Sequence, residues 1–244
     1  MKEKQRLDKI LVLKNYVESV SKAKAIIMAG KVLVNDIKIE KPGTKFTNDI
    51  LIRVIKKSHD WVSRGGIKLN HALNELNINV ENKICVDLGS STGGFTDVLI
   101  RRKAKHVYCV DVGKGLLDWK IFTNDRVTVV ESTNVRNLYI DDISSEVTFL
   151  TCDLSFISLT KALEKIVKTK RKNIAIIALI KPQFELSREM IGKNGVVQNS
   201  NYRNKAITKV CDWFTLNGWT KRDIIKSPIT GAAGNKEYFI YCIK

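Results

Sequence analysis

The sequence lacks the cysteine patterns of metal sites and of disulfide-linked secreted proteins. Its 244 residues include five cysteines, and none of them forms a CxxC or CxxxH pattern. Most lie inside apolar runs such as ICVDLG and YCVDVG, where cysteine behaves as a small buried hydrophobe. An odd number of cysteines without metal-ligand spacing favours a reducing compartment. The sequence therefore predicts a cytoplasmic protein without a metal site.

Long hydrophobic runs are also missing. The longest clean apolar run, IAIIALI over residues 174–180, is much shorter than the roughly 20 residues that cross a bilayer. The first residues, MKEKQRLDKILVLKN, lack the apolar centre of a signal peptide. No long, strongly amphipathic helix is evident in the sequence either. We therefore expect no membrane association.

Positive charge, in contrast, is abundant. Lys and Arg number 42 against 25 Asp and Glu, which gives a formal net charge of +17 and a sequence pI of about 9.7. Residues 1–60 contribute +7 (14 − 7), and the other 184 residues contribute +10 (28 − 18), so the N-terminal quarter is the more basic per residue. A protein this basic usually binds a polyanion, with nucleic acid the first candidate and an anionic membrane surface the second.

The N-terminal quarter reads as a compact unit of two helices and several short strands. RLDKILVLKNYV predicts a short helix, and SVSKAKAIIMAGKV predicts a second one with Ser19 or Ser21 as its N-cap and Gly30 as its terminator. KVLVND, IKIEKPGTKF and DILIRVI alternate as short strands do. Lysines on the outer face would give such a unit a basic surface that can bind the phosphates of a nucleic-acid backbone.

The pattern RLDKILV…SVSKAKAIIMAGKVLVND resembles the αL-motif RNA-binding domain, which occurs in a ribosomal protein and in some RNA-modifying enzymes. The resemblance implies that Arg6, Ser21, Lys24 and Lys31 lie on an RNA-binding face. The plainer alternative is that these side chains only keep the surface hydrated. We assign residues 1–60 to this domain and its linker, with residues 47–62 as the junction.

From residue 80 the pattern changes to strands that alternate with helices. KICVDLG, HVYCVDVG, VTVVES, VTFLTCDLS and NIAIIALIKP are near-continuous apolar runs, which is typical of buried parallel strands. Helix-length segments such as FTDVLIRRKA, LTKALEKIVKTKR and YRNKAITKVCDWFTLNG lie between them. The alternation predicts a Rossmann-like, doubly wound α/β domain of six or seven strands over residues 61–244.

The segment VDLGSSTGGFTDVL predicts a ligand site where the first of these strands turns into a helix. Gly89 allows the turn, while Gly93 and Gly94 allow the backbone to approach a ligand at the helix N-terminus. Asp111 ends the next strand, where an acid can accept hydrogen bonds from the ribose hydroxyls of an adenosine. The spacing does not match the GxGxxG dinucleotide fingerprint, and a Walker lysine is missing.

The D-x-G-x-x-x-G-G spacing instead resembles the S-adenosylmethionine loop of class I methyltransferases. The resemblance implies that the methionine part of this cofactor lies along Gly89, Gly93 and Phe95, with Asp111 on the ribose. It also implies that Asp87 orients the amino end of the cofactor indirectly, and that Asn134 lies near the adenine. The predicted cofactor-binding residues are Asp87, Gly89, Gly93, Gly94, Phe95, Asp111 and Asn134.

Three charged residues sit at the ends of predicted strands. Asp153 follows the fourth strand, Lys181 follows the fifth, and Glu237 precedes the last. Each alone would be an ordinary solvated charge, but the carboxyl edge of an open α/β sheet is where ligands bind. The sequence therefore predicts that the three side chains meet in one site.

With Lys68 these residues resemble the Lys-Asp-Lys-Glu tetrad of FtsJ-like ribose 2′-O-methyltransferases. The segments WVSRGGIKL, VDLGSSTGGFTDVLI, CDLSFISL, IKPQFEL, GKNGVV and SPITGAAGNKEYFIY extend the resemblance to the TlyA family over nearly the whole chain. The resemblance implies methylation of a cytidine in ribosomal RNA. The short chain resembles members limited to the large subunit. A membrane-active haemolysin and a non-catalytic RNA-binding assembly factor are the alternatives.

The predicted chemistry is in-line methyl transfer to a ribose hydroxyl. We expect Lys181 to lie nearest the 2′-oxygen as base or orienting group and Asp153 to fix it, while Lys68 and Glu237 complete the site. In SRGGIKL (63–69) we expect a linker that bends at its two glycines, with Arg64 on an RNA phosphate. Phe156 is expected in the core rather than as a base-stacking platform.

Overall fold

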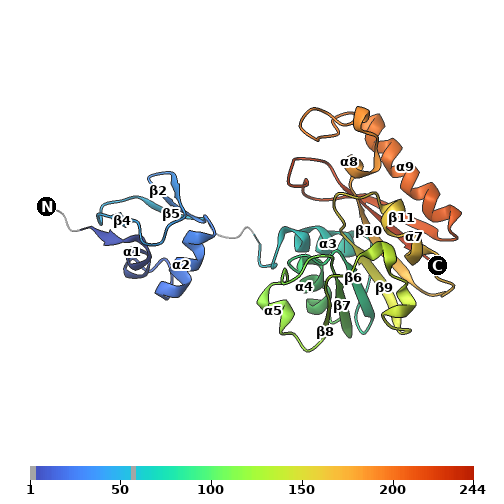
Figure 1. Ribbon diagram of the computed structural model, residues 1–244, viewed down its shortest axis with the longest axis horizontal. Coiled ribbons are helices and arrows are strands. Elements are labelled where there is room, and N and C mark those ends of the chain that lie inside the picture. The colour runs from blue at the N-terminus through green and yellow to red at the C-terminus, as the bar shows by residue number, and fades with distance from the viewer. Residues whose placement is uncertain (1–3, 56–58) are drawn as a thin grey trace. The chain divides into compact units, whose positions relative to one another are not determined.

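The chain folds into two compact units, Met1–Asp60 and Trp61–Lys244, in a computed structural model that describes residues 4–55 and 59–244 (Figure 1). The part of the predicted junction at 56–58 lies outside the described residues. The two units have separate hydrophobic cores, because the apolar residues of the first unit cluster only with one another.

The small unit packs two helices against short strands. Helices α1 (Leu7–Leu13) and α2 (Val20–Met28) bury their apolar stripes against the antiparallel sheet β3-β2-β5, and β1 pairs with β4. The strands are β1 (Gln5–Arg6), β2 (Val32–Val34), β3 (Ile37–Ile39), β4 (Lys45–Phe46) and β5 (Ile52–Val54). Ser19 is the N-cap of α2, accepting a hydrogen bond from the Lys22 backbone N–H at 3.2 Å. The predicted junction over 47–62 is too long, because β5 pairs with β2 and so belongs to this unit.

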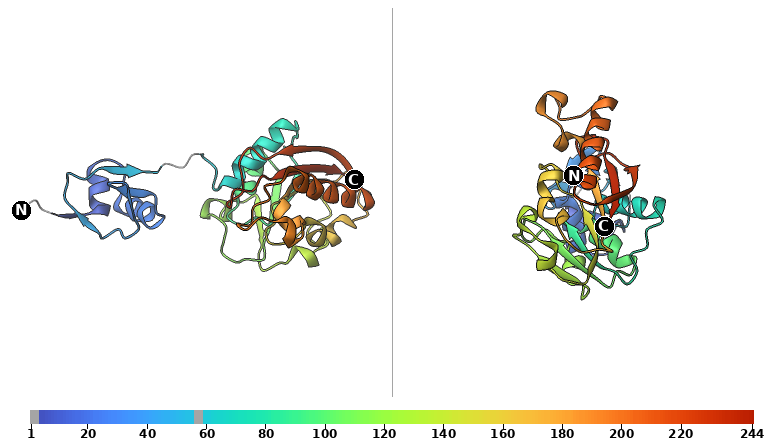
Figure 2. Two further views of the ribbon diagram at one scale, coloured as in Figure 1. Left: turned by 90° about the horizontal axis from the view of Figure 1, so that it is seen from above. Right: turned by 90° about the vertical axis from the view of Figure 1, so that its right-hand side faces the viewer.

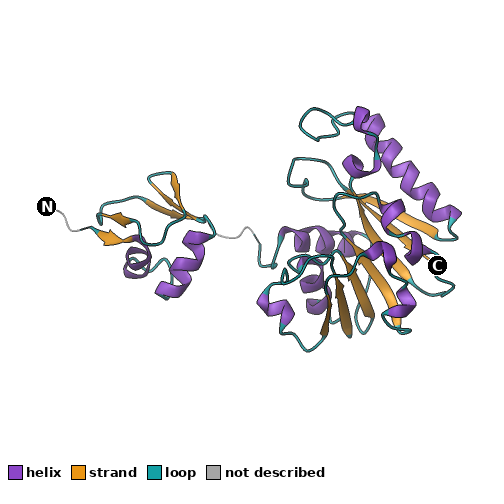
Figure 3. Ribbon diagram, in the orientation of Figure 1, coloured by secondary structure: helices purple, strands orange, loops and turns teal. Residues whose placement is uncertain are grey.

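The large unit is built on one seven-stranded sheet in the order β11-β12-β10-β9-β6-β7-β8. Figure 3 draws its strands in orange. Its strands are β6 (Ile84–Leu88), β7 (His106–Val110), β8 (Val127–Val130), β9 (Val147–Cys152), β10 (Ala175–Ile180), β11 (Thr220–Lys226) and β12 (Tyr238–Ile243). The strands from β6 to β10 run parallel, and β12 is antiparallel to both of its neighbours. The predicted doubly wound α/β fold is confirmed.

Helices cover both faces of this sheet (Figure 2). On one face α3 (Arg64–Glu75) and α4 (Gly94–Arg101) pack through Leu69, Leu73 and Leu99, and on the other α9 (Ser200–Leu216) packs through Val210 and Phe214. The remaining helices are α5 (Trp119–Phe122), α6 (Leu159–Ala162), α7 (Glu164–Val167), α8 (Pro182–Glu185) and the 3₁₀ turns η1 (Val135–Asn137), η2 (Ile140–Asp142) and η3 (Arg188–Met190). The single helix predicted over LTKALEKIVKTKR is wrong, since α6 ends before α7 begins.

The segment SRGGIKL is the start of helix α3, so the predicted bending linker is wrong. Ser63 caps the helix by accepting a hydrogen bond from the Gly65 backbone N–H at 3.3 Å. A Cβ on Gly66 would lie 2.4 Å from Cγ of Trp61, and a Cβ on Gly94 would lie 3.1 Å from the Gly66 backbone nitrogen. The glycines therefore let Trp61 and α4 pack closely against α3, and they hold Lys68 on a rigid helix.

Candidate active site

The register of the sheet brings three of the predicted catalytic residues to its carboxyl edge. Ile180, the last residue of β10, pairs with Tyr238, the first residue of β12. Lys181 follows Ile180 and Glu237 precedes Tyr238, so the two residues lie at the same edge of the sheet. Asp153 follows β9, the strand on the other side of β10, and its backbone N–H donates to the Leu88 carbonyl at 3.0 Å. Three strands distant in sequence therefore place their charged residues along one edge.

Four charged side chains at this edge form two ion pairs. Lys68 Nζ, from helix α3, lies 2.6 Å from Glu237 Oε2, and Lys181 Nζ lies 2.6 Å from Asp153 Oδ1. Lys68, Lys181 and Glu237 are each less than 10% exposed. Because a buried charge is costly without a partner, the four residues are held as pairs rather than as independent charges.

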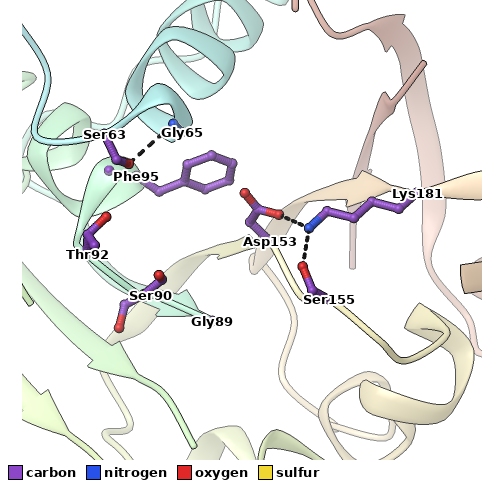
Figure 4. Close-up of a pocket in the computed structure, with 11 residues that line it drawn as sticks. Ser63, Gly65, Gly89, Ser90, Thr92, Phe95, Asp153, Ser155 and Lys181 are labelled. Atoms are coloured by element: carbon purple, nitrogen blue, oxygen red, sulfur yellow. Dashed lines mark hydrogen bonds and ion pairs between the residues drawn. The ribbon is translucent and has the colours of Figure 1, made fainter. Parts of the chain in front are cut away.

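Ser155 also contacts Lys181, and the sequence did not predict it. Lys181 Nζ donates a hydrogen bond to Ser155 Oγ at 2.7 Å, beside the ion pair with Asp153 (Figure 4). Its only sequence signal is its place two residues after a strand-end acid. A serine in a loop is too common a feature for that position to single it out.

The glycine-rich loop lines a polar cavity next to Lys181. Gly89 and Gly93 have φ values of +81° and +88°, which favour glycine, and a Cβ on Gly89 would lie 2.8 Å from the Asp153 carbonyl oxygen. The cavity is lined by Ser63, Gly65, Gly89, Ser90, Ser91, Thr92, Gly94, Phe95, Asp153, Ser155 and Lys181 (Figure 4). Of the predicted loop residues, Gly89, Gly94 and Phe95 line it and Gly93 does not.

A second, more apolar cavity adjoins the first and shares Gly89, Ser91, Asp153 and Ser155 with it. Asp111 lies in its wall and is held by two backbone donors, Ser91 N–H to Oδ2 and Gly113 N–H to Oδ1, both at 2.8 Å. The wall also contains Val112, Leu116, Thr133, Asn134, Val135, Leu154, Phe156 and Ile157. The Asn134 side chain accepts from the Arg136 backbone N–H at 3.1 Å. The two cavities together combine a polar end with an apolar end.

Asp87 lies behind the loop and lines neither cavity. Its carboxylate accepts hydrogen bonds from Thr96 Oγ1 of α4 at 2.7 Å and from Thr151 Oγ1 of β9 at 2.8 Å. Complete burial raises the pKa of Asp87 to about 6, against the opposing effect of these hydroxyl donors. Asp87 therefore ties β6, α4 and β9 together beneath the loop.

Phe156 is on the surface, so the prediction that it lies in the core is wrong. Its side chain is 91% exposed, and its φ of +64° is a left-handed conformation that is uncommon for a bulky residue. Its ring centroid lies 5.4 Å from that of Phe184, which follows Lys181 on α8. Phe156 lines the second cavity and a further one that also contains Arg136 and Phe184.

The predicted RNA-facing residues of the small unit are polar and mostly exposed. Ser21 and Lys24 are exposed on α2, and Lys31 is half-buried. Arg6 donates to both oxygens of the buried Asp8 carboxylate, at 3.0 and 2.6 Å, and this contact holds the pKa of Asp8 below its ordinary value. The guanidinium of Arg6 is thus already engaged within the unit.

Arg64 belongs to the large unit, at the start of α3. Its guanidinium donates to the Thr230 carbonyl oxygen at 2.8 Å, and the residue is exposed. Arg64 therefore fixes the loop before β12 and leaves part of its side chain open to solvent.

Residues 4–55 and 59–244 contain no cluster of three or more His, Cys, Asp or Glu side chains that could bind a metal ion. The same residues contain no helix that is long and apolar enough to span a membrane.

Comparison with known proteins defines the class to which this fold and site belong. A model of the FtsJ-like methyltransferase family matches residues 61–244, and a model of the S4 domain matches residues 5–47. The chain is therefore a methyltransferase of the FtsJ-like family that carries an S4 domain. The resemblance stated from the sequence is confirmed.

Relatives of known name narrow this class. "16S/23S rRNA (cytidine-2'-O)-methyltransferase TlyA" of Mycobacterium tuberculosis is 38% identical over 242 residues, 99% of this chain and 90% of that protein. "Hemolysin A" of Brachyspira hyodysenteriae is 39% identical over 98% of this chain and 99% of its own. "23S rRNA (cytidine-2'-O)-methyltransferase TlyA" of Campylobacter jejuni is 33% identical over 95% of this chain and 84% of its own. At this identity and coverage the chain belongs to the TlyA family.

A solved structure shows the same architecture. This structure is of a Streptococcus thermophilus protein described as a hemolysin. Its sequence is 37% identical to this chain, and the two structures superpose with a TM-score of 0.75. The match covers 100% of this chain and 90% of that one. Both units of the fold therefore recur in an independently solved relative.

Proposed function

We propose that this protein is an S-adenosylmethionine-dependent methyltransferase of the 2′-hydroxyl of a cytidine in ribosomal RNA, with large-subunit RNA as its substrate. The observation that carries the proposal is the pair of buried ion pairs, Lys181–Asp153 and Lys68–Glu237, at the sheet edge beside the glycine loop. The names of the M. tuberculosis and C. jejuni relatives share cytidine 2′-O-methylation and 23S RNA, which supports both parts of the proposal.

The two adjoining cavities fit the proposed cofactor. The polar cavity is lined in part by Gly65, Gly89 and Gly94, so a ligand can approach the backbone there, which suits the amino acid end of S-adenosylmethionine. Asp111 keeps lone pairs free beyond its two backbone donors and faces the second cavity, where it would accept from ribose hydroxyls. Val112, Leu116 and Asn134 would surround the adenine. Asp87 would act only through Thr96 and Thr151, because it lines neither cavity.

The residues at the edge would supply what a poor nucleophile needs. S-adenosylmethionine supplies an electrophilic methyl group when bound. A ribose hydroxyl is almost entirely protonated at neutral pH, so it must be held in line and relieved of its proton. Lys181 lines the polar cavity and would take the proton or orient the oxygen, while Asp153 Oδ1, 2.6 Å from Nζ, would hold that nitrogen in place. Lys68 and Glu237 are lining residues of neither cavity, so they would act from behind the site, as a buried ion pair that supports the sheet edge beside Lys181.

The RNA would be bound by charge and by stacking. The small unit matches the S4 domain and carries +7 of the net charge, which supports Ser21, Lys24 and Lys31 as phosphate contacts. Arg64 would add a contact beside the site. The exposed ring of Phe156, beside the half-buried ring of Phe184, offers a face on which an unstacked base could lie.

The proposal is tested with the full-length protein, labelled S-adenosylmethionine and separated ribosomal subunits that lack the modification. We expect methyl transfer to one cytidine ribose of the large subunit, and none by Lys181→Ala, although that variant still binds the cofactor. Transfer to the small subunit alone would refute the large-subunit assignment. Lysis of erythrocytes by detergent-free protein, unchanged in Lys181→Ala, would instead support a membrane-active protein.

A further inference from the structure

We propose that Ser155 is a positioning residue that sets the direction of the Lys181 side-chain nitrogen toward the substrate hydroxyl. This inference rests on the proposed methyl transfer, because it gives Lys181 a partner that the reaction requires. Ser155 Oγ accepts from Lys181 Nζ at 2.7 Å and lines both cavities of the site.

The two partners of Lys181 act on it in different ways. Asp153 Oδ1 lies 2.6 Å from Nζ, yet within the described residues this oxygen accepts no hydrogen bond of acceptable geometry. The Asp153 contact therefore holds the Lys181 nitrogen close without a hydrogen bond of defined direction. Among the residues that the structure describes, Ser155 Oγ is the one atom that accepts a hydrogen bond from Lys181 Nζ. Because the lysine stem is flexible and its donors rotate, this bond decides where the nitrogen points.

The loop that carries Ser155 is held by the segment that carries Lys181. Four residues after Lys181, the buried Glu185 accepts from Ser158 Oγ at 2.5 Å and from the Leu159 backbone N–H at 2.7 Å. At the other end of the loop, Asp153 is bonded through its backbone to Leu88. The distance between Ser155 and Lys181 is therefore fixed by contacts at both ends of a short loop.

The geometry matters because a neutral lysine has two N–H bonds and one lone pair. With one N–H donated to Ser155 Oγ and the other beside Asp153 Oδ1, the lone pair of such a nitrogen would be left to face the cavity that Lys181 lines. In the proposed reaction the 2′-oxygen forms a bond to the methyl carbon while the carbon–sulfur bond breaks and its electron pair stays on sulfur. The hydroxyl proton passes to Lys181 Nζ, whose lone pair must therefore face that oxygen.

The test compares the kinetics of Ser155→Ala with those of the wild type, with Ser155→Thr as the conservative variant and Lys181→Ala as the inactive reference. We expect Ser155→Ala to lower kcat by roughly 10- to 100-fold, since misplacing a reacting group by about 1 Å costs up to about a hundredfold. The KM for RNA and the Kd for S-adenosylmethionine should change less than about twofold, because the hydroxyl binds neither in this scheme. Ser155→Thr should recover most of kcat.

Ser187→Ala, an exposed serine without a side-chain capping hydrogen bond, is the matched control and should resemble the wild type. Full kcat in Ser155→Ala, with Lys181→Ala inactive, would refute the inference and leave the proposed function intact. Full activity of Lys181→Ala would refute the role of Lys181, and absence of methyl transfer by the wild type would refute the proposed function itself.

Discussion

Removal of Lys68 separates the structural and catalytic contributions of the buried pair it forms with Glu237. The variant Lys68→Met keeps most of the apolar stem of the side chain but leaves Glu237, which is 3% exposed, without its 2.6 Å partner. Breaking one side of a buried ion pair costs about 3–5 kcal/mol, because an uncompensated charge is left behind. For a unit of this size we expect Tm to fall by about 6–20 °C.

The double variant Lys68→Met/Glu237→Gln removes both charges and should recover most of that loss, since a neutral pair carries little desolvation cost. It should nevertheless transfer methyl groups far more slowly than the wild type. The assays are thermal unfolding and single-turnover methyl transfer on the same preparations. If Lys68→Met unfolds at the wild-type temperature, the pair is not a buried, mutually compensating one. If the double variant is as active as the wild type, the pair has no catalytic role.

Three further predictions concern Asp87, Phe156 and the basic face of the small unit. Burial raises the pKa of Asp87 to about 6 in the folded protein, so the folded state binds this proton more tightly than the unfolded chain does. The contribution of Asp87 to the free energy of unfolding therefore falls as pH rises from about 4 to 6, by about 3 kcal/mol. Urea unfolding of Asp87→Asn should lack this component, and an unchanged pH dependence would contradict it. Phe156→Gly should not lower the stability of the protein, since glycine adopts a left-handed φ without strain. The same variant should raise the KM for RNA by about 5- to 150-fold, because one base stacked on an aromatic ring contributes about 1–3 kcal/mol. An unchanged KM would exclude stacking on Phe156. Lys24→Ala should reduce the slope of log affinity against log salt by about one if this exposed lysine contacts a phosphate, and an equal slope would remove Lys24 from the interface.

The sequence predicted both the strands of the sheet and the charged residues at their ends, and the reason is the same for both. Buried parallel strands are continuous apolar runs, and their carboxyl ends share one edge. Asp153, Lys181 and Glu237 each break such a run at its end, so their meeting follows from the topology. Their division into two ion pairs depends on α3, which the sequence did not reveal.

The start of α3 was missed because two glycines disfavour a helix locally. The close packing of Trp61 and α4 against Gly66 overrides that preference, and a contact between distant segments leaves no periodic pattern. Phe156 was assigned to the core because large apolar residues usually lie there, whereas its backbone conformation turns it outward. Ser155 was missed for a related reason, since its hydrogen bond to Lys181 depends on how Glu185 holds the loop.

The central claim is that this edge of the sheet methylates a ribose hydroxyl, and replacement of that hydroxyl tests it most directly. Once the modified cytidine has been mapped, an RNA carrying 2′-deoxycytidine at that one position is compared with the all-ribose RNA in single-turnover methyl transfer. We expect the ribose substrate to gain one methyl group at the 2′-oxygen and the deoxy substrate to gain none while still binding the protein. Equal methylation of the deoxy substrate would place the methyl group on the base and contradict the assignment.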